Sequence, residues 1–198
     1  MSRFPEERSW LRRLHDTEAS DAERAEAREW LAERYRPEAC RWVRALLGPD
    51  TPEARVQSLA WEALLAVLLE ASVDDQATIA TRIRQGLRSQ VEVILFRQAQ
   101  SSDDPAVSLR AKDELVGLYD RLALSLARRF AERGEAPEDL AQVARLGLLN
   151  AIDRFDPSRG YRFATYATQT VVGELKKHFR DRAWGLHVPR SLQETNLA

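Results

Sequence analysis

The chain has 198 residues and a formal net charge of −1, so it is long enough to bury a core and should form one or two small domains. Its single cysteine, Cys40, excludes an internal disulfide and favours a reduced intracellular setting. The charged start lacks the apolar run of a signal peptide, and the longest apolar patch, residues 63–69, is too short to cross a bilayer. We therefore expect a cytoplasmic protein.

The first half of the sequence predicts helices separated by proline. No run of alternating β-branched and aromatic residues is long enough to indicate a sheet, so we expect an all-α protein. Ser20 and Glu23 have the spacing of a capping box, which opens a helix that continues toward Leu47. Pro37 should break or kink this helix, because proline removes a backbone hydrogen bond from a helix interior.

Two further helices are predicted before a boundary. Thr51 and Pro52 form a helix start, and apolar residues follow at helical spacing. The next helix should span residues 76–98. Residues 101–105 are short, polar and end in proline, which is typical of a linker. We place the domain boundary here, between a helical domain at 1–103 and a second domain at 104–198.

The second domain should contain three more helices. The first spans about residues 106–133 and ends at Gly134, where a left-handed cap is usual. Pro137 opens the next helix, and residues 156–160 form a turn after it. The last long helix begins near Phe163 and ends around Arg182.

A faint repeat connects the two domains. Val56-Gln57 resembles Ala141-Gln142 at an offset of 85, and Ile79-Ala-Thr81 matches Phe163-Ala-Thr165 at an offset of 84. A true repeat would make the first domain a degenerate copy of the second. Chance similarity between amphipathic helices is an equal alternative.

The stretch from Arg159 to Phe179 combines aromatic rings, hydroxyl groups and cations. Rings stack on bases, hydroxyl and amide groups hydrogen-bond base edges, and cations neutralise phosphates, so this composition suits an unpaired nucleic-acid strand. Between residues 157 and 190 seven basic residues stand against two acidic ones. A solvated helix face and an aromatic pair in the core remain the alternative interpretation.

An enzyme is the least favoured class. The sequence has no phosphate-binding glycine loop and no nucleophile beside a base. His178 and His187 have no cysteine or histidine partners at ligand spacing, so we expect no metal site and no cofactor.

Ordered motifs run through the second half: Leu126-Ala-Arg-Arg-Phe130, Glu138-Asp-Leu-Ala-Gln142, Gly147-Leu-Leu-Asn-Ala-Ile-Asp-Arg-Phe-Asp-Pro157, Phe163-Ala-Thr-Tyr-Ala-Thr168, Val172-Gly-Glu174, Phe179-Arg-Asp-Arg182 and Val188-Pro-Arg-Ser-Leu-Gln-Glu194. With these motifs, residues 107–194 resemble the promoter-melting domain, region two, of bacterial RNA polymerase sigma factors of the alternative stress-response and sporulation group. The resemblance implies that fold for the second domain.

The resemblance also implies two partners and their contact residues. Core RNA polymerase would be bound through the clamp helices of its largest subunit by Asp139, Gln142, Val143, Arg145 and Leu149. The non-template strand of the minus ten promoter element would be bound by Tyr161, Arg162, Phe163, Thr165, Tyr166, Gln169, Thr170, Glu174, Lys177, Arg190 and Glu194. Gln169 and Thr170 stand where housekeeping members carry two tryptophans, which implies strict promoter selectivity.

The function implied is a sigma-type transcription initiation factor that binds core polymerase and melts the minus ten element. The alternative is a sigma-like regulatory protein that binds polymerase or another partner without opening promoters, and an anti-sigma factor is a further candidate partner. Family members continue into a domain that reads the minus thirty-five element, so we expect either a piece of a longer protein or a natural short sigma-like protein.

Overall fold

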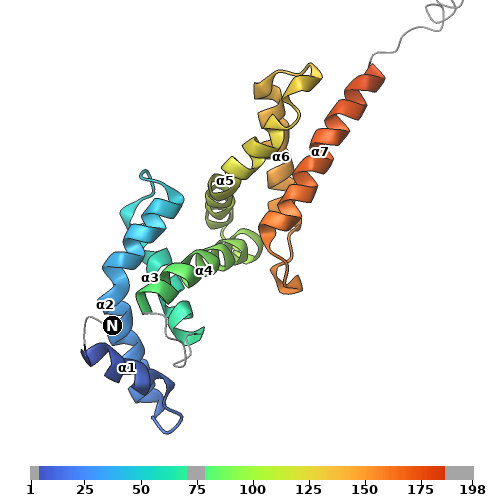
Figure 1. Cartoon of the computed structure of the whole chain (residues 1–198). Coiled ribbons are helices and arrows are strands. Elements are labelled where there is room, and N and C mark those ends of the chain that lie inside the picture. Colours follow the sequence, from blue (N-terminus) through green and yellow to red (C-terminus); the bar gives the residue numbers. More distant parts are fainter. Residues whose placement is uncertain (1–4, 71–78, 186–198) are drawn as a thin grey trace, which may run out of the picture. The chain divides into compact units, whose positions relative to one another are not determined.

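The computed structural model describes residues 5–70 and 79–185 (Figure 1). Within these ranges the chain forms helices and no strand, which confirms the all-α prediction. The chain divides into two compact units, residues 1–114 and 115–198, and the division falls inside helix α5 (Pro105–Arg128). None of the described helices is long and apolar enough to cross a membrane.

The first unit is built around α2. Its helices are α1 (Pro5–His15), α2 (Asp21–Leu47), α3 (Glu53–Glu70) and α4 (Ile79–Ser101), followed by the start of α5. Helix α2 packs against α1, α3 and α4, and α3 also packs against α4. The largest fully buried side chains of the unit come from α2, α3 and α4: Leu31, Val43, Leu59, Leu64, Leu68, Ile83 and Leu95.

Helix α2 begins with the predicted capping box. The backbone N–H of Glu23 donates to the Ser20 hydroxyl at 3.3 Å, and the Glu23 carboxylate accepts from the Ser20 N–H at 2.8 Å. Pro37 does not break the helix, because α2 continues through it to Leu47, and of the two predicted outcomes only a kink stays a prediction. Tyr35 and Ala39 on either side are buried, so packing outweighs the one lost backbone hydrogen bond.

The second unit consists of the rest of α5, the 3-10 turns η1 (Ala131–Arg133) and η2 (Pro157–Arg159), and the helices α6 (Pro137–Arg154) and α7 (Phe163–Gly185). Helix α5 ends earlier than expected, at Arg128, and η1 fills the remaining distance to Gly134. Gly134 has φ +84°, the left-handed conformation that was predicted there. Pro137 is the first residue of α6, also as predicted.

Helices α6 and α7 lie side by side along much of their length (Figure 1). Leu115, Leu140, Leu148, Ile152 and Leu175 are fully buried in this unit. They come from all three of its long helices, so one apolar core fixes the position of α7 relative to α6.

Candidate nucleic-acid interface

The segment that leads into α7 is shaped by a turn and a glycine. Gly160 follows η2 with φ +71°, a conformation that glycine adopts without strain. The first turn of α7 closes when the backbone N–H groups of Thr165 and Tyr166 donate to the carbonyl of Arg162, at 3.0 and 3.4 Å. Tyr161 therefore lies just before the helix, and its side chain is 69% exposed.

Phe163, the first residue of α7, is buried in the core with 3% exposure. Its ring contacts Tyr119 and Phe155 edge to face, with centroid distances of 4.7 and 5.1 Å. Phe163 thus anchors the start of α7 and presents no ring face to a base, and we leave it out of the proposed strand-contacting surface.

Tyr166 is half-buried at the edge of this aromatic cluster. Its ring centroid lies 5.7 Å from that of Phe155, at an interplanar angle of 40°. Thr170 stands one turn later, and its hydroxyl donates to the Tyr166 carbonyl at 3.1 Å. Thr165 and Gln169 are both exposed and are also one turn apart. The rings of Tyr161 and Tyr166 are therefore open to solvent to different degrees, and neither is sealed in the core.

Basic side chains on and before α7 differ in whether they have acidic partners. Three of them form ion pairs: Arg159 with Asp156 at 3.2 Å, Arg180 with Asp181 at 3.7 Å, and Arg182 with Glu135 at 2.6 Å. Arg162, Lys176 and Lys177 are exposed and form no ion pair within the described ranges. Fewer basic side chains are therefore available to contact a phosphate than the seven counted in the sequence.

Glu174 contributes to the contact between α6 and α7. Its carboxylate accepts a hydrogen bond from the Asn150 side chain at 3.3 Å, and the side chain is half-buried. Arg190 and Glu194 lie outside the described residues.

The exposed side of α6 carries most of the residues predicted to face polymerase. Asp139 and Gln142 are exposed, Val143 is half-buried and Leu149 is 38% exposed. The sequence interpretation missed Leu146, which is 55% exposed. Its spacing of four residues after Gln142 and three before Leu149 places all three on one helix face, and this signal could have identified it.

Arg145 is held by a residue of α5. Its Nε and Nη2 donate to the two Asp120 carboxylate oxygens, at 2.7 and 3.2 Å. The hydrogen bonds to Asp120, followed by its charge, raise the pKa of Arg145. Arg145 thus pairs with Asp120 inside the second unit, whereas the resemblance assigned it to core polymerase.

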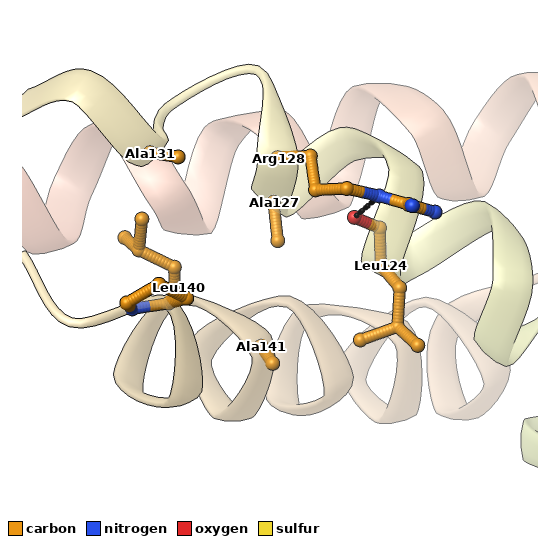
Figure 2. A pocket seen from close by; sticks show the side chains of 7 residues that line it. Leu124, Ala127, Arg128, Ala131, Leu140 and Ala141 are labelled. Carbon is orange, nitrogen blue, oxygen red and sulfur yellow. Dashed lines mark hydrogen bonds between the residues drawn. The ribbon is translucent and has the colours of Figure 1, made fainter.

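An apolar groove lies between the end of α5 and the start of α6, with a volume of about 270 Å³. It is lined by Leu124, Ala127, Arg128, Ala131, Pro137, Leu140 and Ala141. Figure 2 shows Leu124 and Ala127 extending from α5 toward α6, and Ala141 on the facing helix. Arg128 lies along the edge of α5, where its Nε donates to the Leu124 carbonyl at 3.4 Å.

Comparisons with known proteins agree with this arrangement. The family model for sigma-70 region 2 matches residues 115–185. Over 100 residues the chain is 39% identical to a putative RNA polymerase sigma-G factor of Bacillus thuringiensis subsp. kurstaki, covering 50% of this chain and 75% of that protein. The chain belongs to the RNA polymerase sigma factor family. The match confirms the resemblance that the motifs indicated.

Longer sigma factors match the same part of the chain. The RNA polymerase sigma factor SigF of Mycobacterium tuberculosis (strain ATCC 25618 / H37Rv) is 48% identical over 88 residues, which are 44% of this chain and 34% of that protein. The sigma-B factor of Bacillus subtilis (strain 168) is 41% identical over 85 residues, 43% of this chain and 32% of that protein. The chain thus matches about a third of the length of these two sigma factors.

The sigma-70 region 2 match begins where the second compact unit begins and ends with α7. It therefore contains both the α6 surface and the tyrosines at the start of α7. The first unit, residues 1–114, lies outside the match.

Proposed function

We propose that this sigma factor chain binds core RNA polymerase through the exposed face of α6 and captures unpaired bases of the minus ten promoter element at the start of α7. The exposure of Tyr161 is the observation that carries the proposal, and the exposed Arg162 follows it directly in the sequence. A flat ring beside a cation without an acidic partner can stack on a base while the cation contacts the phosphate.

The balance of energies supports strand capture without any chemical reaction. Extruding a base from a duplex costs a few kcal/mol, and each base stacked on an aromatic ring returns about 1–3 kcal/mol. Tyr161 and the half-buried Tyr166 offer two such rings near one another in sequence. Together they can shift the equilibrium toward the opened strand.

The α6 side of the proposal depends on exposed apolar residues. The apolar side chains of Leu146 and Leu149 are exposed to solvent, and Gln142 lies on the same helix face. An amphipathic helix that shows apolar residues to solvent is suited to dock against helices of a partner. We assign this face to the clamp helices of the largest polymerase subunit.

Two variants test the two surfaces separately. Y161A should weaken binding to a single-stranded oligonucleotide with the minus ten sequence by about ten-fold, and should leave binding to core polymerase unchanged. L149D should weaken binding to core polymerase and leave binding to the oligonucleotide unchanged. Fluorescence anisotropy with labelled DNA and a pull-down with core polymerase give the two readouts.

The same pair of variants separates the proposal from the regulatory alternative. If L149D abolishes polymerase binding but the native chain shows no preference for single-stranded DNA, the chain is a sigma-like regulator that does not open promoters. Equal loss of both activities in Y161A would contradict base capture, because Tyr161 is exposed and its truncation removes little from the core.

A further inference from the structure

The helices of the two units repeat at one constant spacing. One offset of 84 relates the start of α2 to that of α5 and the start of α3 to that of α6. Helical periodicity alone can align any two amphipathic helices, but it does not fix the starts of two successive helices at one offset.

The same offset pairs buried residues with buried residues. On α2 and α5 the pairs are Ala27/Ala111, Leu31/Leu115, Tyr35/Tyr119, Ala39/Ala123 and Val43/Ala127. On α3 and α6 they are Val56/Leu140, Ala60/Ala144, Ala63/Gly147, Leu64/Leu148, Val67/Ala151 and Leu68/Ile152. On α4 and α7 they are Ile83/Ala167, Leu87/Val171 and Val91/Leu175. The helices of residues 21–101 and those of residues 105–185 therefore bury equivalent faces.

A contact between helices recurs at equivalent positions with different chemistry. In the second unit, Asp120 of α5 pairs with Arg145 of α6. At the same offset, the corresponding positions of the first unit are Arg36 of α2 and Trp61 of α3, and the Arg36 guanidinium lies over the Trp61 ring at 5.4 Å. In both units a cation thus joins the two helices, although it comes from the opposite helix.

The groove between α5 and α6 marks a difference between the units. The equivalent place in the first unit is bridged by polar side chains: Arg44 of α2 forms an ion pair with Glu53 of α3, and the Gln57 amide donates to Glu53 at 3.0 Å. The second unit keeps the arginine, as Arg128, but has Pro137 and Ala141 in place of the glutamate and the glutamine. Within the described ranges Arg128 forms no ion pair.

We propose that the two units are divergent copies of one fold, and that this groove in the second copy binds a partner-protein segment that carries a carboxylate beside apolar side chains. The groove lining is apolar apart from Arg128 at its edge. In the first copy the equivalent arginine holds the carboxylate of the chain's own Glu53. A partner segment would supply the carboxylate that the second copy lacks, with its apolar side chains against Leu124 and Ala141.

This site is separate from the surfaces assigned above. The groove residues include none of those proposed to contact polymerase or DNA. Binding in the groove requires neither polymerase nor a promoter, so a negative result leaves the strand and polymerase experiments unaffected.

The test uses two synthetic, alanine-based helical peptides of about 14 residues, long enough for measurable helicity. One carries leucine and glutamate one turn apart, and the other has glutamine in place of the glutamate. They are titrated into the full chain with labelled leucine and alanine methyl groups. We expect saturable NMR shifts at Leu124, Ala131 and Ala141, with about three-fold tighter binding of the glutamate peptide.

Two variants show whether the groove and its cation are responsible. P137E/A141Q gives the second copy the residues of the first, so it should form its own pair with Arg128 and lose peptide binding. R128Q should abolish the preference for the glutamate peptide. Unchanged methyl signals from Leu148 and Leu175, which are buried in the second unit and do not line the groove, would show that each variant is folded.

Three results would overturn the proposal. The first is the absence of saturable shifts, and the second is undiminished peptide binding by P137E/A141Q. The third is a set of groove shifts that depend on chain concentration without peptide, which would make a second copy of the chain the occupant.

The equivalence of the copies has its own readout. R128Q should lower the melting temperature of the P137E/A141Q chain more than that of the native chain, because only the former has gained a carboxylate partner for Arg128. Equal losses would show that positions 128 and 137 do not correspond to Arg44 and Glu53.

Discussion

Helices α6 and α7 meet backbone to backbone at Gly147 and Val171, since a β-carbon on Gly147 would stand 3.0 Å from the Val171 Cα. The same β-carbon would lie 3.3 Å from Glu174, which is hydrogen-bonded to Asn150. The close approach places the proposed polymerase face and the proposed strand-contacting surface on one rigid helix pair.

Gly147→Ala should therefore destabilise the second unit. The added methyl group must push apart two packed helices, so we expect a loss of about 1–3 kcal/mol despite alanine's better helix propensity. Hydrogen exchange of the α6 amides measures it. Gly117→Ala is the matched control, since nothing lies within 4 Å of its added β-carbon, and it should be neutral or stabilising. Equal hydrogen-exchange protection of the α6 amides in Gly147→Ala and Gly117→Ala would contradict the close contact between Gly147 and Val171.

Lys177→Gln should reduce the salt dependence of single-strand binding. Lys177 is exposed and has no ion pair within the described ranges, so a phosphate contact would release about one counterion. The slope of log affinity against log salt concentration should become shallower by about 0.7. Arg110→Gln, an exposed change in the first unit, should leave the slope unchanged. An unaltered slope in Lys177→Gln would exclude that contact.

Sequence predicted helix starts well, because capping signals are local. Ser20 and Pro137 each marked a boundary that the structure contains. The break that Pro37 could have caused does not occur, because burial of neighbouring residues keeps the helix continuous, and such packing is not visible in a local pattern. The motif containing Phe163 was found, but the partition of its aromatic residues between core and surface depends on Tyr119, distant in sequence.

The repeat shows the same limit. The match of residues 79–81 to 163–165 had the offset of 84 that the helices follow, whereas the match at Val56-Gln57 was shifted by one position. In the helix register Val56 corresponds to Leu140, and both are fully buried. Burial and contacts between helices, which sequence does not show, were needed to choose between the two offsets.

The start of α2 should respond to acid. Hydrogen bonds from Ser20 lower the pKa of Glu23 in the folded chain. A carboxylate whose folded pKa is lowered stabilises the fold above its unfolded pKa, near 4.3, and the contribution is lost as pH falls through the folded value. Glu23→Gln should remove this part of the pH dependence, measured by urea unfolding at neutral pH and about pH 3.

Ser20→Ala provides the companion measurement at neutral pH. It removes the acceptor for the Glu23 N–H, and loss of an N-cap costs about 1 kcal/mol. Tryptophan fluorescence reports mainly on the first unit, which contains four of the five tryptophans, Trp10, Trp30, Trp42 and Trp61. If Ser20→Ala unfolds at the same urea concentration as the native chain, the capping box does not hold the start of α2.

Leu146→Ala should weaken binding to core polymerase without affecting stability. Leu146 is 55% exposed on the α6 face, so its truncation removes little from the core and should change the free energy of unfolding by less than about 0.5 kcal/mol. A buried contact with a partner helix would be lost, with a cost near 1 kcal/mol, or about five-fold in affinity. Leu69→Ala is the matched control, because Leu69 is 61% exposed on α3 of the first unit. Equal effects of the two variants on polymerase affinity would mean that exposed leucines contribute only nonspecific adhesion, and the α6 face would lose its assignment.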